Sequence, residues 1–170
     1  MNCQRISLRP FEASDLDELQ AVMGHPDVMR FSLSGPNTKT ETEDFIKRCR
    51  AQYQEFGYGL LAIVCREENR VIGYCGLFRQ EIDGVPELEI GYRLHPSYWG
   101  RGMATEAAVM IRDWAFANLD QGKLISIIEP ENAAAIAVAK KIGMNFERKF
   151  LFKGQRLTHI YSLRKTQELN

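Results

Sequence analysis

The stretch from Leu94 to Ala107, which reads LHPSYWGRGMATEA, constrains this chain more than any other feature. A strand-like segment ends there, a short loop with Gly100 and Gly102 follows, and the next residues have the composition of a helix start. Glycine lets the backbone approach a ligand closely because it has no Cβ. The first amides of a helix have no partner within the helix and lie at the positive end of its dipole. The stretch therefore predicts either a cradle for a diphosphate or a tight strand-to-helix turn.

Size and composition indicate one globular domain. The 170 residues are 45% hydrophobic, and 22 basic side chains balance 22 acidic ones. A neutral chain gives no electrostatic reason to expect a nucleic acid or an anionic membrane as partner. No apolar run is long enough to cross a bilayer, and the N-terminus lacks the apolar core of a signal peptide. We therefore expect a cytoplasmic protein that binds neither nucleic acid nor membrane.

The four cysteines follow no pattern of metal ligands or disulfide pairing. Cys3, Cys49, Cys65 and Cys75 form no CxxC pair, and no histidine cluster accompanies them at metal-binding spacing. We expect free thiols and no bound metal.

The order of the predicted elements indicates a mixed α/β domain. The expected strands are 5–9, 59–65, 71–79, 87–94, 123–128, 145–152 and 155–163. The expected helices begin near Ser14 as N-cap, at a capping box of Thr40 and Glu43, after Gly102, and at Asn132. Antiparallel strands thus come first, and a strand–helix–strand–helix unit follows.

A dinucleotide-binding fold is one alternative interpretation of the glycine loop. That fold requires G-x-G-x-x-G after an apolar strand and an acidic residue at the end of the next strand. Glu129 satisfies the second requirement, but Thr105 occupies the position of the third glycine. The preceding strand also contains Glu87 and Glu89, which suit a half-exposed antiparallel strand better than a buried parallel one. The pattern therefore disfavours a nicotinamide enzyme.

Three motifs in a fixed order give the chain a resemblance to a known family. They are 89–92 (EIGY), 99–107 (WGRGMATEA), and Glu131-Asn132 leading to 141–144 (KIGM). With them, the chain resembles the GNAT superfamily of N-acetyltransferases, in particular the ribosomal-protein N-acetyltransferase-like branch, over essentially its whole length. The resemblance implies a single N-acetyltransferase domain over residues 1–170. Its sheet would be mostly antiparallel and twisted, would splay beside the helix after Gly102, and would be flanked by helices.

The same resemblance implies the two substrates. Acetyl-CoA would be the donor, and a primary amine would be the acceptor, either a protein N-terminal α-amine or a small-molecule amine. We expect a monomer or a homodimer. The neutral net charge gives a slight reason against basic ribosomal proteins as acceptors.

By the resemblance, the donor site consists mostly of backbone. The groups that would hold the CoA diphosphate are the amides of Arg101, Gly102, Met103, Ala104 and Thr105. Leu94 would offer backbone groups to the pantetheine and its N–H to the thioester carbonyl, where charge develops on the oxygen. Asn132 would reach the pantetheine, although a helix N-cap is the plainer role for this residue and the two roles can coexist.

Glu89 occupies the position that the family uses for a base. The acceptor amine must be neutral when it attacks, so a base or a water chain must take its proton. Alternation along the strand places Glu89 and Glu87 on one face. The other interpretation of either residue is an ion pair with a basic side chain from a neighbouring strand, and Glu87 fits that role better.

Two positions depart from the family pattern. Ala139 stands where many members carry a tyrosine that protonates the CoA thiolate, and Ala135 replaces the usual serine of the branch. The general acid is therefore unassigned. No cysteine lies in the motifs, which favours direct transfer in a ternary complex. The alternative is a domain that binds or senses acyl-CoA with little turnover.

The acceptor site has the weakest sequence signal. Arg30, Phe31, Tyr58 and the segment 80–86, which is expected to be a loop, are candidates for its wall because loops carry many binding residues.

Overall fold

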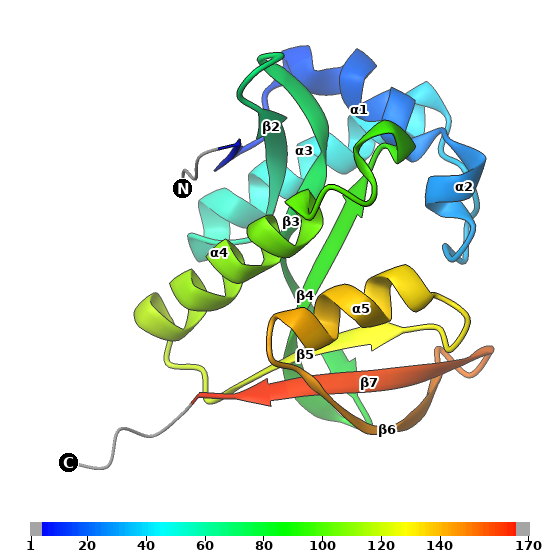
Figure 1. Cartoon of the computed structure of the whole chain (residues 1–170), viewed down its shortest axis with the longest axis vertical. Coiled ribbons are helices and arrows are strands. Elements are labelled where there is room, and N and C mark those ends of the chain that lie inside the picture. The colour runs from blue at the N-terminus through cyan, green and yellow to red at the C-terminus, as the bar shows by residue number, and fades with distance from the viewer. Residues whose placement is uncertain (1–4, 166–170) are drawn as a thin grey trace.

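The computed structural model describes residues 5–165 and contains one seven-stranded sheet with helices on both faces (Figure 1). The strands are β1 (Ile6–Arg9), β2 (Leu60–Cys65), β3 (Arg70–Ile82), β4 (Val85–Leu94), β5 (Lys123–Ile128), β6 (Asn145–Phe152) and β7 (Arg156–Arg164). They lie in the order β1-β2-β3-β4-β5-β7-β6. Every pair is antiparallel except β4 and β5, which are parallel. The expected fold class, a mostly antiparallel sheet flanked by helices, is confirmed.

Two layers of helices cover the sheet. The helices are α1 (Leu16–Met23), α2 (Pro26–Met29), α3 (Lys39–Phe56), α4 (Met103–Asn118) and α5 (Ala133–Lys141), with short 3₁₀ turns η1 (Ala13–Asp15) and η2 (Pro96–Tyr98). One buried cluster joins α4 and α5 to one face of the sheet, and a second joins α1, α2 and α3 to the other. In Figure 1, β4 runs from the half of the molecule that holds α5 to the half that holds α1–α3.

Local chemistry explains why the longest hairpin forms. The turn between β3 and β4 has Asp83 at φ 53° and Gly84 at φ 79°. Two consecutive residues with positive φ match the right-handed twist of a two-residue hairpin, and Asp-Gly is a favoured pair for it. The hairpin aligns β3 and β4 over ten residue pairs, from Gly73–Leu94 to Ile82–Val85. This long pairing gives the central strand of the site a fixed register.

Two helix starts differ from the sequence prediction. The capping box of α3 is Thr38 with Glu41, not Thr40 with Glu43: the Glu41 N–H donates to Thr38 Oγ1 at 3.3 Å, and the Thr38 N–H donates to Glu41 Oε2 at 2.7 Å. The earlier start adds half a turn and buries Thr42, whose hydroxyl donates to Gln20 of α1. Contact with α1 thus decides between two capping boxes that the pattern alone leaves equivalent.

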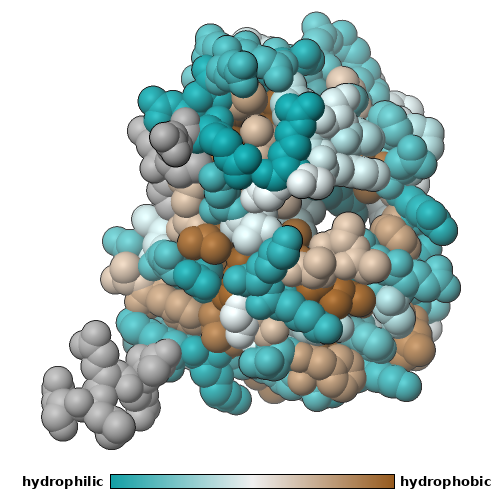
Figure 2. All heavy atoms as spheres, in the orientation of Figure 1, coloured by the Kyte–Doolittle hydropathy of each residue, from teal (hydrophilic) through white to brown (hydrophobic). Residues whose placement is uncertain are grey.

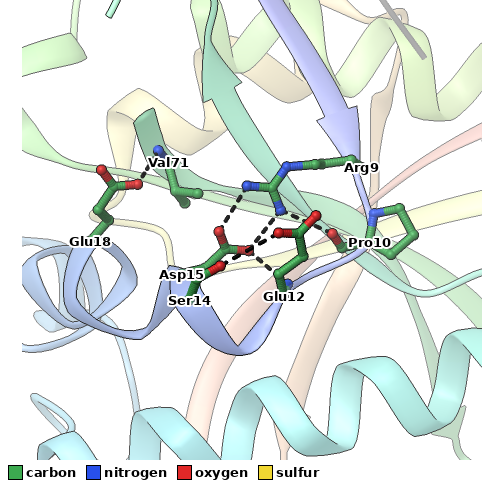
Figure 3. A network of polar contacts seen from close by, with 7 residues as sticks. All are labelled: Arg9, Pro10, Glu12, Ser14, Asp15, Glu18 and Val71. Carbon is green, nitrogen blue, oxygen red and sulfur yellow. Dashed lines mark hydrogen bonds and ion pairs between the residues drawn. The ribbon is translucent and has the colours of Figure 1, made fainter. Parts of the chain in front are cut away.

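Ser14 is not the N-cap that the pattern predicts, because the chain enters α1 through η1, whose N-cap is Glu12 and whose capping box is completed by Asp15. Arg9 of β1 donates to both carboxylate oxygens of Asp15 at 2.7 Å, and the Glu12 N–H donates to the same carboxylate at 2.8 Å (Figure 3). In the same region, Glu18 accepts a 2.7 Å hydrogen bond from the Val71 N–H. These contacts fix the first helices against the edge of β1 and the start of β3.

The described residues agree with the expectation of free thiols. Cys49, Cys65 and Cys75 are buried and form no disulfide, and burial raises the pKa of the Cys49 thiol to about 12. The prediction for Cys3 concerns a residue outside the described ones. Within 5–165 no group of three or more His, Cys, Asp or Glu side chains is arranged to hold a metal ion, and no helix there is long and apolar enough to span a bilayer.

Candidate functional site

The candidate site begins where β4 and β5 separate. The two strands pair only at Glu89 and Ile125, so backbone groups nearer their carboxyl ends have no partner across the pair. Two side chains supply the hydrogen-bond partners that these backbone groups lack. Ser126 Oγ donates to the Ile90 carbonyl at 2.8 Å, and the Ile127 N–H donates to Glu89 Oε1 at 3.2 Å. Because buried backbone groups need hydrogen-bond partners, these contacts stabilise the opening.

Glu89 lies at the wall of this opening and has an unusual acidity. Its second oxygen, Oε2, accepts a hydrogen bond from Gln80 Nε2 at 2.7 Å. Burial raises the pKa of the Glu89 carboxyl to about 7, while the contacts with Gln80, Ile127 and Arg93 act in the opposite direction. Desolvation is the largest of these effects. It raises the pKa because removal from water disfavours the charged carboxylate. A carboxyl group with this pKa can take up or release a proton near neutral pH.

The two acidic residues of β4 have different partners. Glu87 forms a 2.7 Å ion pair with Lys123 of β5, so the expectation that Glu87 is the ion-paired residue is confirmed. Glu89 forms no ion pair with a described residue, and its partners are an amide side chain and a backbone N–H. The alternative interpretation of Glu89 as half of an ion pair is therefore wrong.

The glycine loop has the backbone conformation of a cradle. Gly100 and Gly102 have φ values of 73° and 80°, in the left-handed region that favours glycine. Gly102 is the N-cap of α4, no side chain caps this end, and the Glu106 N–H makes the first helical bond, to the Gly102 carbonyl at 3.0 Å. The amides of residues 103–105 therefore lack helical partners. This is the arrangement that an anion requires.

Arg5 lies behind the cradle, a contact that the sequence pattern does not indicate. Its Nη1 donates to the Arg101 carbonyl at 2.8 Å, and its Nε pairs with Glu106 of α4 at 3.1 Å. Its Nη2 lies 3.5 Å from the point where a Cβ on Gly102 would stand. Arg5 thus links the N-terminal segment to the cradle, with its charge paired to Glu106. About a hundred residues separate the two segments, so no local motif could reveal the contact.

Leu94 presents one backbone group to the opening. The next residue, His95, donates its N–H to Ile72 of the β2–β3 side at 2.9 Å. Since hydrogen-bonding direction alternates along a strand, the N–H and C=O of Leu94 face the opposite edge, toward the opening. There Trp99 Nε1 donates to the Leu94 carbonyl at 2.8 Å. The Leu94 carbonyl thus already accepts one hydrogen bond, and the role of the Leu94 backbone toward a ligand stays a prediction.

The start of α5 forms the other wall of the opening. Asn132 Oδ1 accepts a hydrogen bond from the Ala135 N–H at 3.1 Å, so its role as helix N-cap is confirmed. The Tyr92 hydroxyl of β4 donates to the Ala135 carbonyl at 2.8 Å and ties the two walls together. Ala139 is completely buried. Neither alanine position supplies a hydroxyl, which leaves the general acid unassigned.

A cavity of about 440 Å³ lies against Glu89. Three regions line it: the segment after α2, the β3–β4 face that carries Glu89, and the residues of β5, α5 and the β6–β7 turn. Figure 2 shows a hollow in the surface between the two halves of the molecule, on the side of α2. The cavity reaches the β4–β5 opening, because Asn132, Tyr92 and Ser126 belong to its lining.

The structure places only some of the residues expected at the acceptor wall beside this cavity. Phe31 and Gln80 line the cavity, but Arg30 and Tyr58 do not, and Tyr58 lies with Pro86 at a separate hollow. Residues 80–82 are part of β3 and not of a loop, because the Ile82 side chain is buried against β5 and β7 and extends the strand to the turn. The expectation of a loop over 80–86 was therefore wrong, because β3 ends at Ile82 and β4 begins at Val85.

Comparison with known proteins gives a consistent assignment. The family model described as acetyltransferase (GNAT) domain matches residues 5–145. The uncharacterized protein YkkB of Bacillus subtilis is 33% identical over 145 residues, which cover 85% of this chain and 84% of that protein. The spermidine N(1)-acetyltransferase of Escherichia coli is 26% identical and covers 88% of this chain and 80% of its own length. The solved structure of RimL, a ribosomal-protein α-N-acetyltransferase in complex with coenzyme A, matches with a TM-score of 0.79 at 19% identity and 95% coverage of both chains.

Proposed function

This chain belongs to the GNAT acetyltransferase family and uses acetyl-CoA, and from this premise we propose that it transfers the acetyl group directly to a primary amine in a ternary complex. The acceptor is a protein N-terminal α-amine or a small-molecule amine, and one domain over residues 1–170 carries both substrates. The observation that carries this proposal is the position of Glu89. A carboxyl group with a pKa of about 7 lies where the cavity meets the β4–β5 opening.

The donor side fits the diphosphate and the thioester of acetyl-CoA. The amides of the glycine loop and of the first turn of α4 would bind the diphosphate; they belong to Arg101, Gly102, Met103, Ala104 and Thr105. Anion binding there gains about 0.3–1 kcal/mol from the helix dipole, and each hydrogen bond to a charged acceptor adds about 1.5–3 kcal/mol. The Leu94 N–H would meet the thioester carbonyl, and Asn132 would contact the pantetheine while it caps α5.

On the acceptor side, Glu89 would receive the proton that the amine must lose. In the transfer, the N–C bond forms, the C–S bond of the thioester breaks, and the electron pair leaves on sulfur. A proton accepted by Glu89 directly or through one water leaves the amine nitrogen neutral for attack. The thiolate has an ordinary pKa near 8.5 and leaves without a dedicated acid, which agrees with the alanines at positions 135 and 139.

The proposed function is tested by measuring thiol release from acetyl-CoA with and without a panel of primary amines. The panel contains amino acids, spermidine, alkylamines and short peptides with a free N-terminus. We expect release that depends on an amine and saturates with it. The opposite outcome, tight binding of CoA by calorimetry with no amine-dependent release, would favour a domain that senses acyl-CoA.

A further inference from the structure

The charges around the cavity are unequal. Its lining contains three basic side chains, Arg93, Lys153 and Arg156, and two carboxyl groups, Glu89 and Glu129. Arg156 and Glu129 form an ion pair and neutralise each other. Desolvation keeps Glu89 partly protonated at neutral pH, since its pKa lies near 7. Two cations, Arg93 and Lys153, therefore face the cavity with only one weak acid to balance them.

Arg93 is the most informative of these cations. It is half-buried, and its Nη1 contacts Met29 of α2, whose thioether sulfur is a weak acceptor. No carboxylate among residues 5–165 lies at ion-pair distance from its guanidinium, although Glu89 is close enough for Arg93 to lower its pKa. A guanidinium that is removed from water without a charged partner is unfavourable, and an anionic ligand would supply that partner.

The face of β4 arranges this cation relative to the proposed base. Glu89, Gly91 and Arg93 alternate onto one face, and all three line the cavity. The ring of Phe78 covers Gly91 so closely that a Cβ there would stand 2.2 Å from it. The face therefore presents a carboxyl group, then an aromatic surface, then a guanidinium. Phe31 and Phe152 add apolar surface to the same cavity.

We propose that the acceptor is a small primary amine that carries a carboxylate and an apolar body on the same molecule, as an apolar amino acid does. Its amine lies at Glu89, its apolar part lies on the Phe78 ring, and its carboxylate pairs with Arg93 with help from Lys153. A polyamine would place several positive charges beside these two cations and is disfavoured. This inference rests on the proposed acetyl transfer, because it concerns the second substrate of that reaction.

The test compares amines that differ only in a carboxylate. The pairs are L-phenylalanine and 2-phenylethylamine, L-leucine and 3-methylbutylamine, and 4-aminobutyrate and propylamine, with L-phenylalaninamide, spermidine and a short acidic peptide as further probes. Two quantities are measured for each amine: its Kd for protein saturated with CoA, by calorimetry, and kcat/KM for acetyl transfer. We expect the carboxylate member to be preferred about tenfold in at least one pair.

Variants assign the preference to the cavity. Arg93→Gln is expected to reduce the ratio within the preferred pair to below threefold, and Arg93→Lys, which keeps the charge, is expected to retain much of it. Lys153→Gln is expected to reduce the ratio less than Arg93→Gln does. Because Lys153 lies at a turn outside the core, this variant still tests the inference if Arg93→Gln fails to fold. Arg50→Gln is the matched control, because Arg50 is an exposed arginine of α3 outside the cavity lining. It should leave the ratio unchanged.

Each outcome decides the inference separately from the proposed function. Ratios below threefold in every pair, tighter binding of spermidine, or a preference for the acidic peptide would overturn the inference while amine-dependent acetylation stands. A carboxylate preference that survives both Arg93→Gln and Lys153→Gln would also overturn it. Selective binding of the amino acid without any acetyl transfer would support recognition of the carboxylate by the cavity but would reject the proposed function, and with it the role of the amino acid as acceptor. Neither binding nor transfer with any probe would reject both.

Discussion

The two sides of the β4–β5 opening use different parts of the chain. On the α4 side, the groups that we propose to face a ligand are backbone amides, held in place by the left-handed conformations of Gly100 and Gly102. On the α2 side, they are side chains that come from the segment after α2, from β3 and β4, and from the β6–β7 turn. A backbone site depends little on side-chain identity and suits a donor that does not change. A side-chain site can differ between relatives and suits the choice of acceptor.

The largest expected effect lies on the acceptor side. Glu89→Gln should lower kcat about 10²–10⁴-fold, because a positioned general base contributes that much, and should leave the Kd for CoA nearly unchanged. In the wild type, kcat/KM should rise with pH through a midpoint near 7, where the Glu89 carboxyl loses its proton. The variant should lack this limb. A wild-type midpoint near 7 that persists in Glu89→Gln would remove Glu89 from the mechanism.

The same substitution should change stability in a way that depends on pH. Because the pKa of Glu89 rises from 4.5 when unfolded to about 7 when folded, wild-type stability falls as pH rises through this window. Glutamine keeps the acceptor for Ile127 and never ionises. The free energy of unfolding of Glu89→Gln relative to wild type should therefore increase by roughly 2–4 kcal/mol between pH 4 and pH 8.

Chemical denaturation at several pH values measures this difference. Glu81→Gln is the control, since Glu81 is an exposed carboxylate on the same hairpin. Its difference from wild type should stay flat across the range. A flat profile for Glu89→Gln as well would show that burial does not raise the pKa of Glu89. Glu89 would then not titrate near neutral pH as the proposed mechanism requires.

The smallest expected effect lies on the donor side. Gly102→Val and Gly57→Val place a side chain at similar left-handed positions, with φ values of 80° and 73°. Each should lose about 1–2 kcal/mol of stability from backbone strain. Only Gly102→Val should also weaken CoA binding, about tenfold, because losing one hydrogen bond to a charged group costs about 1.5–3 kcal/mol. Equal CoA affinity in the two variants would mean that the glycine loop is only a tight turn and does not bind CoA.

The contrast between a site made of backbone and a site made of side chains also explains what the sequence could predict. The donor loop, the order of the elements, and the cap at Asn132 follow from local rules, since a positive φ selects glycine and a helix start selects asparagine. The chemistry of Glu89 follows from strand alternation together with the family motif. Its hydrogen bond to Ile127, the bond from Trp99 to Leu94, and the position of Arg5 behind the cradle join segments that no local pattern relates.

The cavity that we propose for the acceptor could not be predicted for the same physical reason. Arg93, Phe78 and Lys153 lie far apart in sequence, and only the pairing of β3 with β4 and the fold of the last hairpin bring them to one cavity. The two wrong helix caps have a similar cause. Thr38 and Thr40 offer equivalent capping boxes, and the contact of Thr42 with Gln20 chooses between them. Local signals place elements, and tertiary contacts select among the local alternatives.

The most direct test of the account is a calorimetric titration of the folded wild-type protein with coenzyme A. The unpaired amides at the start of α4 and the Leu94 N–H predict a saturable heat with one site per chain. Folded protein that gives no heat with coenzyme A would contradict the donor site, and with it the acetyl transfer assigned to this opening.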